Sequence, residues 1–359
     1  MPEEEKSVRI DKNFEGGNIR VLSISDERAD LAVELRDTIG SWFYWAFRVT
    51  GAAGRTVTFH FPEGRRVGYY GAAVSHDLIR WQWTRPYSED FSSFTYTFGP
   101  EEDEAYFCHH MRYSTGQFEA LCRELHLPIQ TLTLSEQGRP VPYVQIGSGE
   151  KLVLFTSRHH ACESTGTYLL EGILRTLASN PLEDCTVIAV PFMDIDGVVN
   201  GDQGKNRAPY DHNVDYLDQQ IYASTRALKQ LALERGAYCF IDLHSPGHLG
   251  GRYDVVHIVN SKRHSAPQQT FGRLLTVQNE QHPLAVRYHT SNDLPFGVEW
   301  NNDQDGGLPG LSFIWFGDNS RLSVSLETPY FGPADNVVSQ SAMIELGVCV
   351  AQAVRDFLS

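Results

Sequence analysis

Two histidines and two glutamates of this 359-residue chain stand where side chains could meet around a metal ion. His160 and Glu163 lie three residues apart in the stretch RHHACE. His244 follows the apolar run YCFIDL, and Glu327 follows LSVSL. Two histidines and one glutamate, with a fourth position left for water, form a ligand set of catalytic zinc sites. The residue types therefore predict metal-dependent chemistry, with zinc as the metal.

Each of these residues follows a predicted β-strand. Residues 151–156 (KLVLFT) form a predicted strand that leads into RHHACE, and the predicted strands 238–243 and 322–326 end at His244 and Glu327. In open α/β sheets, sites form in the crevice beyond the carboxyl ends of the strands. We therefore expect the four side chains to lie along one edge of one sheet.

The pattern H-x-x-[D/E] is weak evidence by itself, because the composition predicts about two matches by chance. It begins three times, at His60, His160 and His212. His60-Phe61-Pro62-Glu63 lies in a strand-to-turn segment with no other candidate ligand nearby in the chain, and we interpret it as structural. The match at His160 carries more weight because a strand, a loop and a helix surround it in the expected order.

The second part of the chain alternates strands with amphipathic helices. Such alternation predicts an α/β fold, with a mixed, largely parallel sheet flanked by helices, over residues 116–359. The predicted helices are 113–125, 163–177, 218–235 and 336–358, and the remaining predicted strands are 186–192 and 255–259.

The first part of the chain, residues 1–115, reads as a small all-β domain. Short stretches rich in β-branched and aromatic residues predict strands at 18–25, 41–49, 55–61 and 94–98, separated by turns. This pattern favours a β-sandwich-like unit. Its dense aromatic side chains are interpreted as the core of that unit rather than as a ligand platform.

Composition excludes several classes of function. The formal net charge is −15, which disfavours nucleic acids and anionic membranes as partners. The N-terminal stretch MPEEEKSVRIDKNF lacks the apolar core of a secretory signal. Six cysteines without paired spacing are interpreted as reduced thiols. Together these features predict a cytoplasmic protein.

The order of the motifs resembles a known family. His160-x-x-Glu163, then Arg207, then Asp242-Leu243-His244, then Glu327 are similar to the motifs of zinc carboxypeptidases of the carboxypeptidase A type. The all-β unit ahead of them and the lead-in Arg158-x-His160 resemble the cytosolic carboxypeptidase branch. With that unit, the resemblance covers nearly the whole chain.

The resemblance implies a role for each matched residue. His160, Glu163 and His244 would bind one zinc ion per chain, and Glu327 would act as the general base and acid. Arg207 would stabilise the oxyanion. The implied activity is a zinc metallocarboxypeptidase, a hydrolase that removes C-terminal residues from peptides or proteins.

One departure from the family pattern concerns substrate binding. The family uses an Asn-Arg pair to bind the terminal carboxylate, but this chain has Asn213 followed by Val214. Valine cannot pair with a carboxylate. We therefore expect Asn213 to bind the substrate together with a cation that replaces the missing arginine. Candidates for that cation are Arg158, Arg252, Arg263 and Arg287. Tyr288 is available for the loop tyrosine that many members of the family carry, but no tyrosine is assigned.

Val214 also leaves other functions open. A zinc amidohydrolase or deacylase acting on N-acyl amides would not need a cation for a free C-terminus. A non-catalytic binding protein is disfavoured because Glu327 is present. Asp242 shares a strand face with His244 and would either orient a ligand histidine or accept hydrogen bonds from backbone. Residues 301–307 (NNDQDGG) are predicted to form a loop at the rim of the site.

Overall fold

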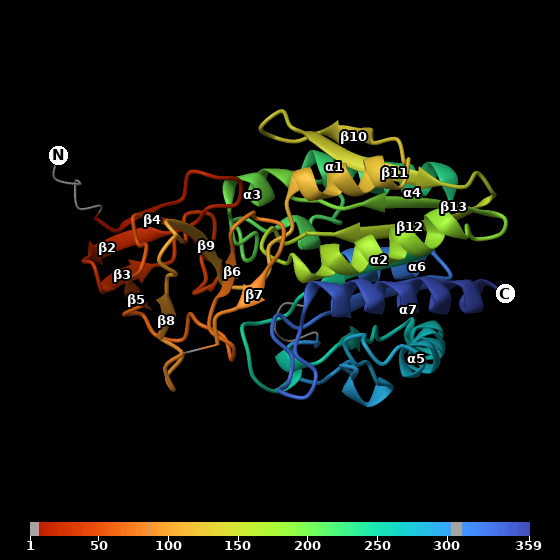
Figure 1. Cartoon of the computed structure of the whole chain (residues 1–359). Coiled ribbons are helices and arrows are strands. Elements are labelled where there is room, and N and C mark those ends of the chain that lie inside the picture. The colour runs from red at the N-terminus through yellow and green to blue at the C-terminus, as the bar shows by residue number, and fades with distance from the viewer. Residues whose placement is uncertain (1–6, 86, 303–310) are drawn as a thin grey trace.

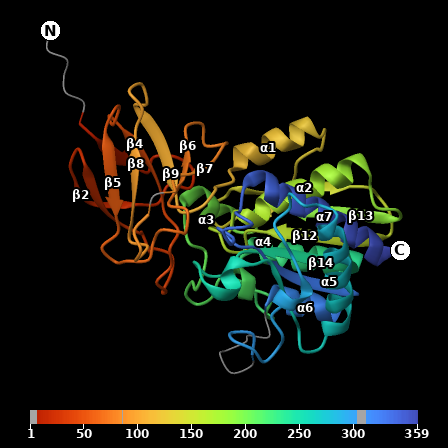
Figure 2. The ribbon, with the colours of Figure 1, turned by 60° about the horizontal axis from the view of Figure 1, so that its bottom comes forward.

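An N-terminal region of β-sheets lies beside a larger, helix-covered sheet in the computed structural model (Figures 1 and 2). The structure describes residues 7–85, 87–302 and 311–359. We call residues 7–108 the N-terminal region and residues 115–359 the C-terminal region. The predicted domain boundary falls at Thr115, which is the first residue of helix α1 (Thr115–Glu124).

The N-terminal region contains two sheets, with the strand orders β1-β4-β9-β6-β7 and β2-β3-β5-β8. Neighbouring strands are antiparallel, except that β3 pairs with β5 in parallel. The prediction of an all-β unit is therefore confirmed. The strands are β1 (Arg9–Asp11), β2 (Arg20–Ile24), β3 (Arg28–Ala32), β4 (Ala46–Thr50), β5 (Thr56–His60), β6 (Ala73–Ser75), β7 (Gln82–Trp83), β8 (Ser93–Thr97) and β9 (Glu104–Cys108).

Aromatic side chains from both sheets fill the core of the N-terminal region. Phe47 of β4 packs against Phe59 of β5 with ring centroids 5.3 Å apart, and this contact joins the two sheets. Trp45 stacks on Phe94 at 5.7 Å. Burial of large aromatic rings supplies much of the hydrophobic stabilisation of a unit of this size. These aromatics are core residues, as the sequence predicted.

The predicted strand 41–49 begins only at Ala46, so residues 41–45 are a correction to the prediction. The reason lies in a contact with the C-terminal region. The backbone N–H of Tyr44 donates to Gln203 Oε1 at 2.9 Å, and Gln203 Nε2 donates to the Tyr44 carbonyl at 2.7 Å. These bonds take the place of a sheet ladder at Tyr44.

The C-terminal region is built on a seven-stranded sheet with the order β10-β11-β13-β12-β14-β16-β15. The four strands from β13 to β16 in this order run parallel to their neighbours, and β10, β11 and β15 add antiparallel edges. This matches the predicted mixed sheet. The strands are β10 (Gln130–Leu134), β11 (Pro140–Ile146), β12 (Lys151–Ser157), β13 (Cys185–Val190), β14 (Ala237–His244), β15 (His257–Val259) and β16 (Leu322–Glu327).

Helices flank this sheet, and α2, α7 and α5 lie side by side in that order (Figure 1). Every residue of β13 is buried, as expected for a parallel strand covered on both faces. Besides α1, the helices are α2 (Thr165–Ser179), α3 (Ile195–Asn200), α4 (Ala223–Arg235), α5 (Ser265–Glu280), α6 (Ser312–Asn319) and α7 (Gln340–Leu358), with short 3-10 turns at His212–Val214, Gly251–Asp254 and Thr290–Asn292.

Some elements differ from the sequence predictions. Helix α4 begins at Ala223 rather than at residue 218, because the Asp215 carboxylate accepts the N–H groups of Ile221 and Tyr222 and fixes a turn there. Helix α7 begins after Ser339, whose side chain accepts from Ala342 N–H. In the C-terminal region, helices α3, α5 and α6 and strands β10 and β11 are not in the prediction. Most of the predicted loop 301–307 lies outside the described residues.

Two further features concern the whole of the described chain. No helix in the described part of the chain is long and apolar enough to cross a membrane. All six cysteines are buried free thiols, in agreement with their interpretation as reduced small side chains.

Candidate metal centre

Three neighbouring strands place the candidate ligands at one edge of the seven-stranded sheet. Strand β14 lies between β12 and β16, and the three run parallel, so their carboxyl ends point the same way. His244, the last residue of β14, lies beside Glu327, the last residue of β16. His160 and Glu163 lie in the loop between β12 and α2. The predicted proximity of these four residues follows from this topology.

The side chains of His160, Glu163 and His244 converge tightly. The two oxygens of the Glu163 carboxylate face one histidine each: Oε1 lies 2.9 Å from His160 Nδ1, and Oε2 lies 2.8 Å from His244 Nδ1. One ligand atom from each of the three residues falls within 4.8 Å of the other two. Glu163 and His244 are almost fully buried, whereas His160 is partly exposed. A metal ion could be held by this group.

Glu327 tests whether the group fits a metal ion. Its Oε1 accepts only a long hydrogen bond, 3.3 Å, from Ser325 Oγ, and its buried Oε2 has no hydrogen-bond partner among the described residues. A buried carboxylate oxygen without a partner is costly. Burial raises the pKa of Glu327 above its usual value. A metal ion with a water molecule on the neighbouring ligands would satisfy Oε2, so the residues present fit zinc.

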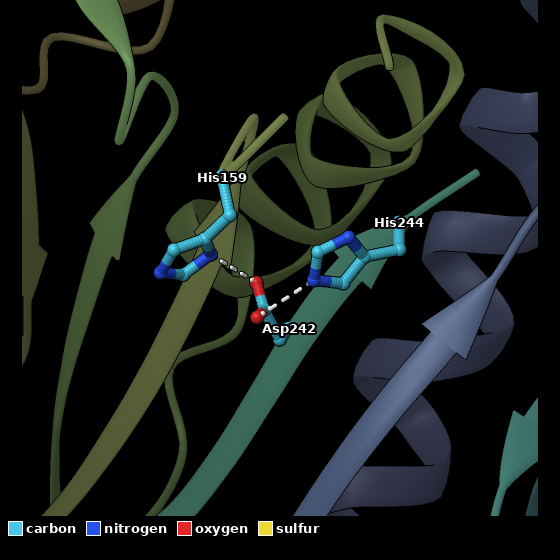
Figure 3. Close-up of side chains that lie close together, drawn as sticks. All are labelled: His159, Asp242 and His244. Atoms are coloured by element: carbon cyan, nitrogen blue, oxygen red, sulfur yellow. Dashed lines mark hydrogen bonds and ion pairs between the residues drawn. The ribbon is translucent and has the colours of Figure 1, made fainter. Parts of the chain in front are cut away.

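Asp242 orients the histidine of β14 (Figure 3). Its Oδ2 accepts from His244 Nε2 and its Oδ1 accepts from His159 Nδ1, both at 2.8 Å. Thr156 Oγ1 and Ser312 Oγ donate to the same carboxylate at 2.7 and 2.6 Å. Because Nε2 of His244 is used in this way, Nδ1 is the nitrogen left to bind a metal. Of the two interpretations that the sequence left open for Asp242, the structure supports histidine orientation.

His159, Asp242 and His244 also lie close enough to be considered as a second metal site. The ring nitrogens and carboxylate oxygens of these residues already have other hydrogen-bond partners. His159 Nε2 lies 2.8 Å from Tyr216 Oη, and the Asp242 carboxylate accepts four hydrogen bonds. All three residues are buried. We therefore assign this group the supporting role that carboxylate–histidine pairs have beside metal ligands.

A cavity of about 310 Å³ opens onto the metal centre. It contains His160, Glu163 and Glu327 in its wall, and Asn213, the predicted substrate-binding asparagine, also lines it. Asn213 Oδ1 lies 2.8 Å from Ser312 Oγ, the hydroxyl that donates to Asp242, so Asn213 contacts the residues around Asp242. The other lining residues are Trp42, Lys205, Ser245, Pro246, Gly247, Tyr253 and Trp300.

Arg207 does not line this cavity. Its guanidinium group is surrounded by three carboxylates, with contacts of 3.2 Å to Asp37, 2.7 Å to Asp194 and 3.1 Å to Asp202. These carboxylates occupy the guanidinium N–H donors that an oxyanion would need. The resemblance assigned the oxyanion role to Arg207, and the structure instead gives it three carboxylate partners.

The other predicted cations also lie away from the described wall of the cavity. Arg158 is 3% exposed, and its Nε donates to the Ala161 carbonyl at 2.6 Å. Arg252, Arg263 and Arg287 each pair with an acidic residue, namely Glu299, Asp318 and Asp335. Tyr288 is buried with its hydroxyl group on Asp293, whereas Tyr253 lines the cavity.

Lys205 and Trp42 are cavity residues that sequence reasoning missed. Lys205 lies two positions before Arg207, in a loop pressed against the ligand loop: a Cβ on Gly204 would lie 2.1 Å from the Ala161 nitrogen. Trp42 comes from the N-terminal region, far away in sequence. The Gly204-Lys205 dipeptide was a usable signal for a tight loop with a cation. Trp42 belongs to the aromatic side chains interpreted as core rather than as a ligand platform, and for Trp42 that interpretation is wrong because its ring lines the cavity.

Comparison with known proteins supports the resemblance inferred from the motifs. Residues 10–110 match the family model of the cytosolic carboxypeptidase N-terminal domain. The chain is 26% identical over 183 residues to an uncharacterized protein of Zymomonas mobilis, covering 48% of this chain and 47% of that one. It is 24% identical over 321 residues to cytosolic carboxypeptidase 1 of Gallus gallus, covering 69% of this chain and 26% of the relative.

The chain thus spans about half or less of the length of these curated relatives. A solved structure, the metallo-carboxypeptidase of Burkholderia cenocepacia, matches with a TM-score of 0.81 at 21% identity, covering 98% of this chain and 99% of that one. At this identity the match establishes the fold. Residues 10–110 are therefore similar to the N-terminal domain of cytosolic carboxypeptidases, and the chain has the fold of the solved metallo-carboxypeptidase.

Proposed function

We propose that this chain is a zinc-dependent metallocarboxypeptidase that removes C-terminal residues from peptides or proteins. One observation carries the proposal: two imidazole Nδ1 atoms converge on the Glu163 carboxylate in the cavity that also holds the unpaired Oε2 of Glu327. His160, Glu163 and His244 would hold the zinc ion, one per chain. The cytosolic carboxypeptidase domain and the metallo-carboxypeptidase fold support this assignment.

The chemistry follows from the positions of these groups. Zinc would polarise the scissile carbonyl and lower the pKa of the attacking water. Glu327 would accept a proton from that water at Oε2 and donate it to the leaving amine nitrogen. Asp242 would keep Nδ1 of His244 facing the metal by accepting the Nε2 proton. Asn213 would offer its amide group to the substrate from the wall of the cavity.

We further propose a cytosolic location and a peptide or protein C-terminus as the substrate, with neither nucleic acid nor membrane as a partner. The names of the relatives and the net charge of −15 support this view. Buried free thiols agree with a reducing compartment.

A second candidate function, a zinc-dependent deacylase of N-acyl amides, is favoured by one observation. Val214 replaces the carboxylate-binding arginine, and no arginine lines the described wall of the cavity. A substrate without a free terminal carboxylate would not need one.

Mass spectrometry of peptides incubated with the zinc-loaded protein distinguishes the two candidates. Each peptide is supplied with a free and with an amidated C-terminus, and Glu327→Gln is the control variant. We expect stepwise loss of terminal residues from the free forms alone, and none with Glu327→Gln. If neither form is cut while N-acyl amides are hydrolysed, the carboxypeptidase assignment is wrong and the deacylase assignment replaces it.

A further inference from the structure

Lys205 is the one lysine or arginine among the described residues that line the cavity of the metal centre. Hydrolysis of an amide places negative charge on the former carbonyl oxygen, and a fixed donor aimed at that oxygen accelerates the reaction. Arg207, the residue expected to supply such a donor, is bound to three carboxylates. The positive charge at the cavity therefore comes from a different side chain of the same loop.

Two backbone carbonyls, an aromatic ring and one carboxylate surround the ammonium group of Lys205. Nζ donates to the backbone carbonyls of Ser245 and Pro246, both at 2.9 Å. It lies 4.9 Å from the centroid of the Trp42 ring, which adds a cation–π contact. Its third contact is an ion pair with Glu163 Oε1. Two donors thus fix the position of the group, and the third points toward a proposed zinc ligand.

The loop that carries Lys205 is also fixed. Gly204 has a φ of +74° and Asn206 a φ of +49°, both in the left-handed region. The Asp37 carboxylate of the N-terminal region accepts the backbone N–H groups of Gln203 and Gly204, at 3.1 and 2.8 Å. Lys205 is therefore preorganised by contacts that a substrate need not make.

We propose that Lys205 is a catalytic residue that donates a hydrogen bond to the scissile carbonyl oxygen. This inference rests on the proposed function. If Glu163 held a metal ion, its Oε1 would no longer need the third N–H of Lys205, which could then donate to the substrate oxygen. The position of Lys205 Nζ favours the scissile carbonyl, because Nζ contacts Glu163, a proposed metal ligand. The terminal carboxylate of the substrate lies one residue further from the scissile bond.

Lys205 keeps its proton throughout the reaction. The attacking water forms a bond to the carbonyl carbon, and the C=O π electrons move to the oxygen that Lys205 faces. Glu327 takes the proton of the water. The oxygen then reforms the C=O bond as the C–N bond breaks, and Glu327 returns the proton to the amine nitrogen. Lys205 contributes charge and a hydrogen bond only, so the step balances without any further reactant.

The test compares Lys205→Met and Lys205→Arg with the wild type. Lys229→Met is a matched control, because Lys229 also donates to a backbone carbonyl, that of Leu217 at 2.8 Å, and lies 5.2 Å from the Trp315 ring, but it is outside the cavity. Four quantities are measured on each variant: bound zinc, kcat for peptides, KM for peptides, and calorimetric affinity for a peptide phosphonate. The phosphonate mimics the charge of the tetrahedral state.

We expect Lys205→Met to bind zinc normally and to lose about 10²–10³-fold in kcat, with little change in KM. Its phosphonate affinity should fall by a similar factor, and Lys205→Arg should restore part of both. Lys229→Met should match the wild type. Thermal unfolding of Lys205→Met checks that the variant is folded.

Three results would overturn the role of Lys205. Unchanged kcat and phosphonate affinity in Lys205→Met would exclude it. A rise in KM for free C-termini at constant kcat would assign Lys205 to the terminal carboxylate instead. Loss of zinc would make Lys205 a residue that only positions Glu163. Failure of the proposed function has a different signature: the wild type itself would bind no zinc or hydrolyse no peptide. Absence of zinc from the wild type overturns both proposals. If the wild type binds zinc but hydrolyses no peptide, the phosphonate affinities of the wild type and of Lys205→Met still test the role of Lys205.

Discussion

His244 presents its two ring nitrogens to two different carboxylates, and this division of contacts defines what the residue can do. Nε2 faces Asp242 and Nδ1 faces Glu163, both at 2.8 Å. A histidine with one nitrogen already protonated and hydrogen-bonded offers the other as a ligand in a fixed ring orientation. Asp242 in turn is held by hydroxyl groups of Thr156 and Ser312. The orientation of His244, a proposed metal ligand, thus depends on Thr156 and Ser312, which are not proposed ligands.

Replacing Asp242 with asparagine should weaken zinc binding. Asparagine keeps the shape of the side chain but removes the charge that stabilises the Nε2 proton of His244, and loss of such a partner typically costs about 10–100-fold in metal affinity. Competition with a chelator measures the change. Asp318→Asn is the matched control, because Asp318 also pairs with a histidine, His264, at 2.8 Å but lies outside the site. Equal zinc affinity in Asp242→Asn and the wild type would contradict this prediction.

The sequence predicted which residues gather at the centre better than it predicted the loop beside it. His160, His244 and Glu327 follow apolar strands, and strand ends in one sheet must meet at one edge. Lys205 and Arg207 lie in an irregular loop in which Gly204 and Asn206 take left-handed φ values. Which of two neighbouring cations faces the cavity depends on distant carboxylates, and sequence spacing does not reveal those contacts.

Glycines allow the backbones of α2 and α7 to touch. A Cβ on Gly172 would lie 1.9 Å from the Ile344 carbonyl oxygen, and a Cβ on Gly347 would lie 2.1 Å from the Leu169 carbonyl oxygen. Real side-chain carbons do not approach so closely, so any larger residue must push the helices apart. Since α2 begins just after Glu163, the spacing of this helix pair also affects the position of this proposed metal ligand.

Gly172→Ala should therefore destabilise the protein, although alanine favours helices. Overpacking of this kind typically costs about 1–3 kcal/mol in the free energy of unfolding. Gly116→Ala in α1 is the control: a Cβ there meets only Ser114 Oγ at 3.9 Å, and we expect a neutral or slightly stabilising effect. Denaturant unfolding compares the two. Equal stability of both variants would show that the helices adjust at no cost.

Periodicity explains which elements the sequence predicted. Strands β12, β13, β14 and β16 are short apolar runs and were found with small errors in their ends. Helix α5, SAPQQTFGRLLTVQNE, carries few apolar residues, with only Phe271, Gly272 and Leu275 buried besides two polar side chains, so its pattern was too weak to recognise. The late start of β4 depends on Gln203, which binds the backbone of Tyr44 from the other region.

At the scale of the whole molecule, neutral histidines lie where the two regions meet. His110, which follows strand β9, has its Nε2 2.7 Å from the Cys162 carbonyl oxygen in the ligand loop. His248, which follows β14, stacks on Phe43 with ring centroids 5.1 Å apart. Burial lowers the pKa of each of these two histidines to about 3. The contact between the regions therefore depends on uncharged imidazoles.

Acid should weaken the protein through these residues. An unfolded chain protonates histidine below a pH of about 6.5, whereas the folded chain keeps His110 neutral down to about 3. Between these values the unfolded state binds more protons than the folded state. As the pH decreases through this range, the free energy of unfolding therefore falls by about 1.4 kcal/mol per pH unit for each such histidine. Denaturant unfolding of the wild type and of His110→Gln at pH 7 and pH 5 measures the effect. We expect a smaller pH dependence in the variant, and parallel curves would refute this account.

Asp37 and Trp42 connect the N-terminal region to the loop that carries Lys205 and Arg207. This arrangement has a consequence for how such proteins evolve. Consider a recombinant gene that joins the C-terminal region to an N-terminal region without these two residues. The loop of Arg207 would lose the carboxylate of Asp37, and the Lys205 ammonium group would lose its contact with the Trp42 ring. The side chains that form the cavity therefore depend on both regions at once. We expect the two regions to be inherited as a matched pair, with Asp37 and Arg207 exchanged together across lineages.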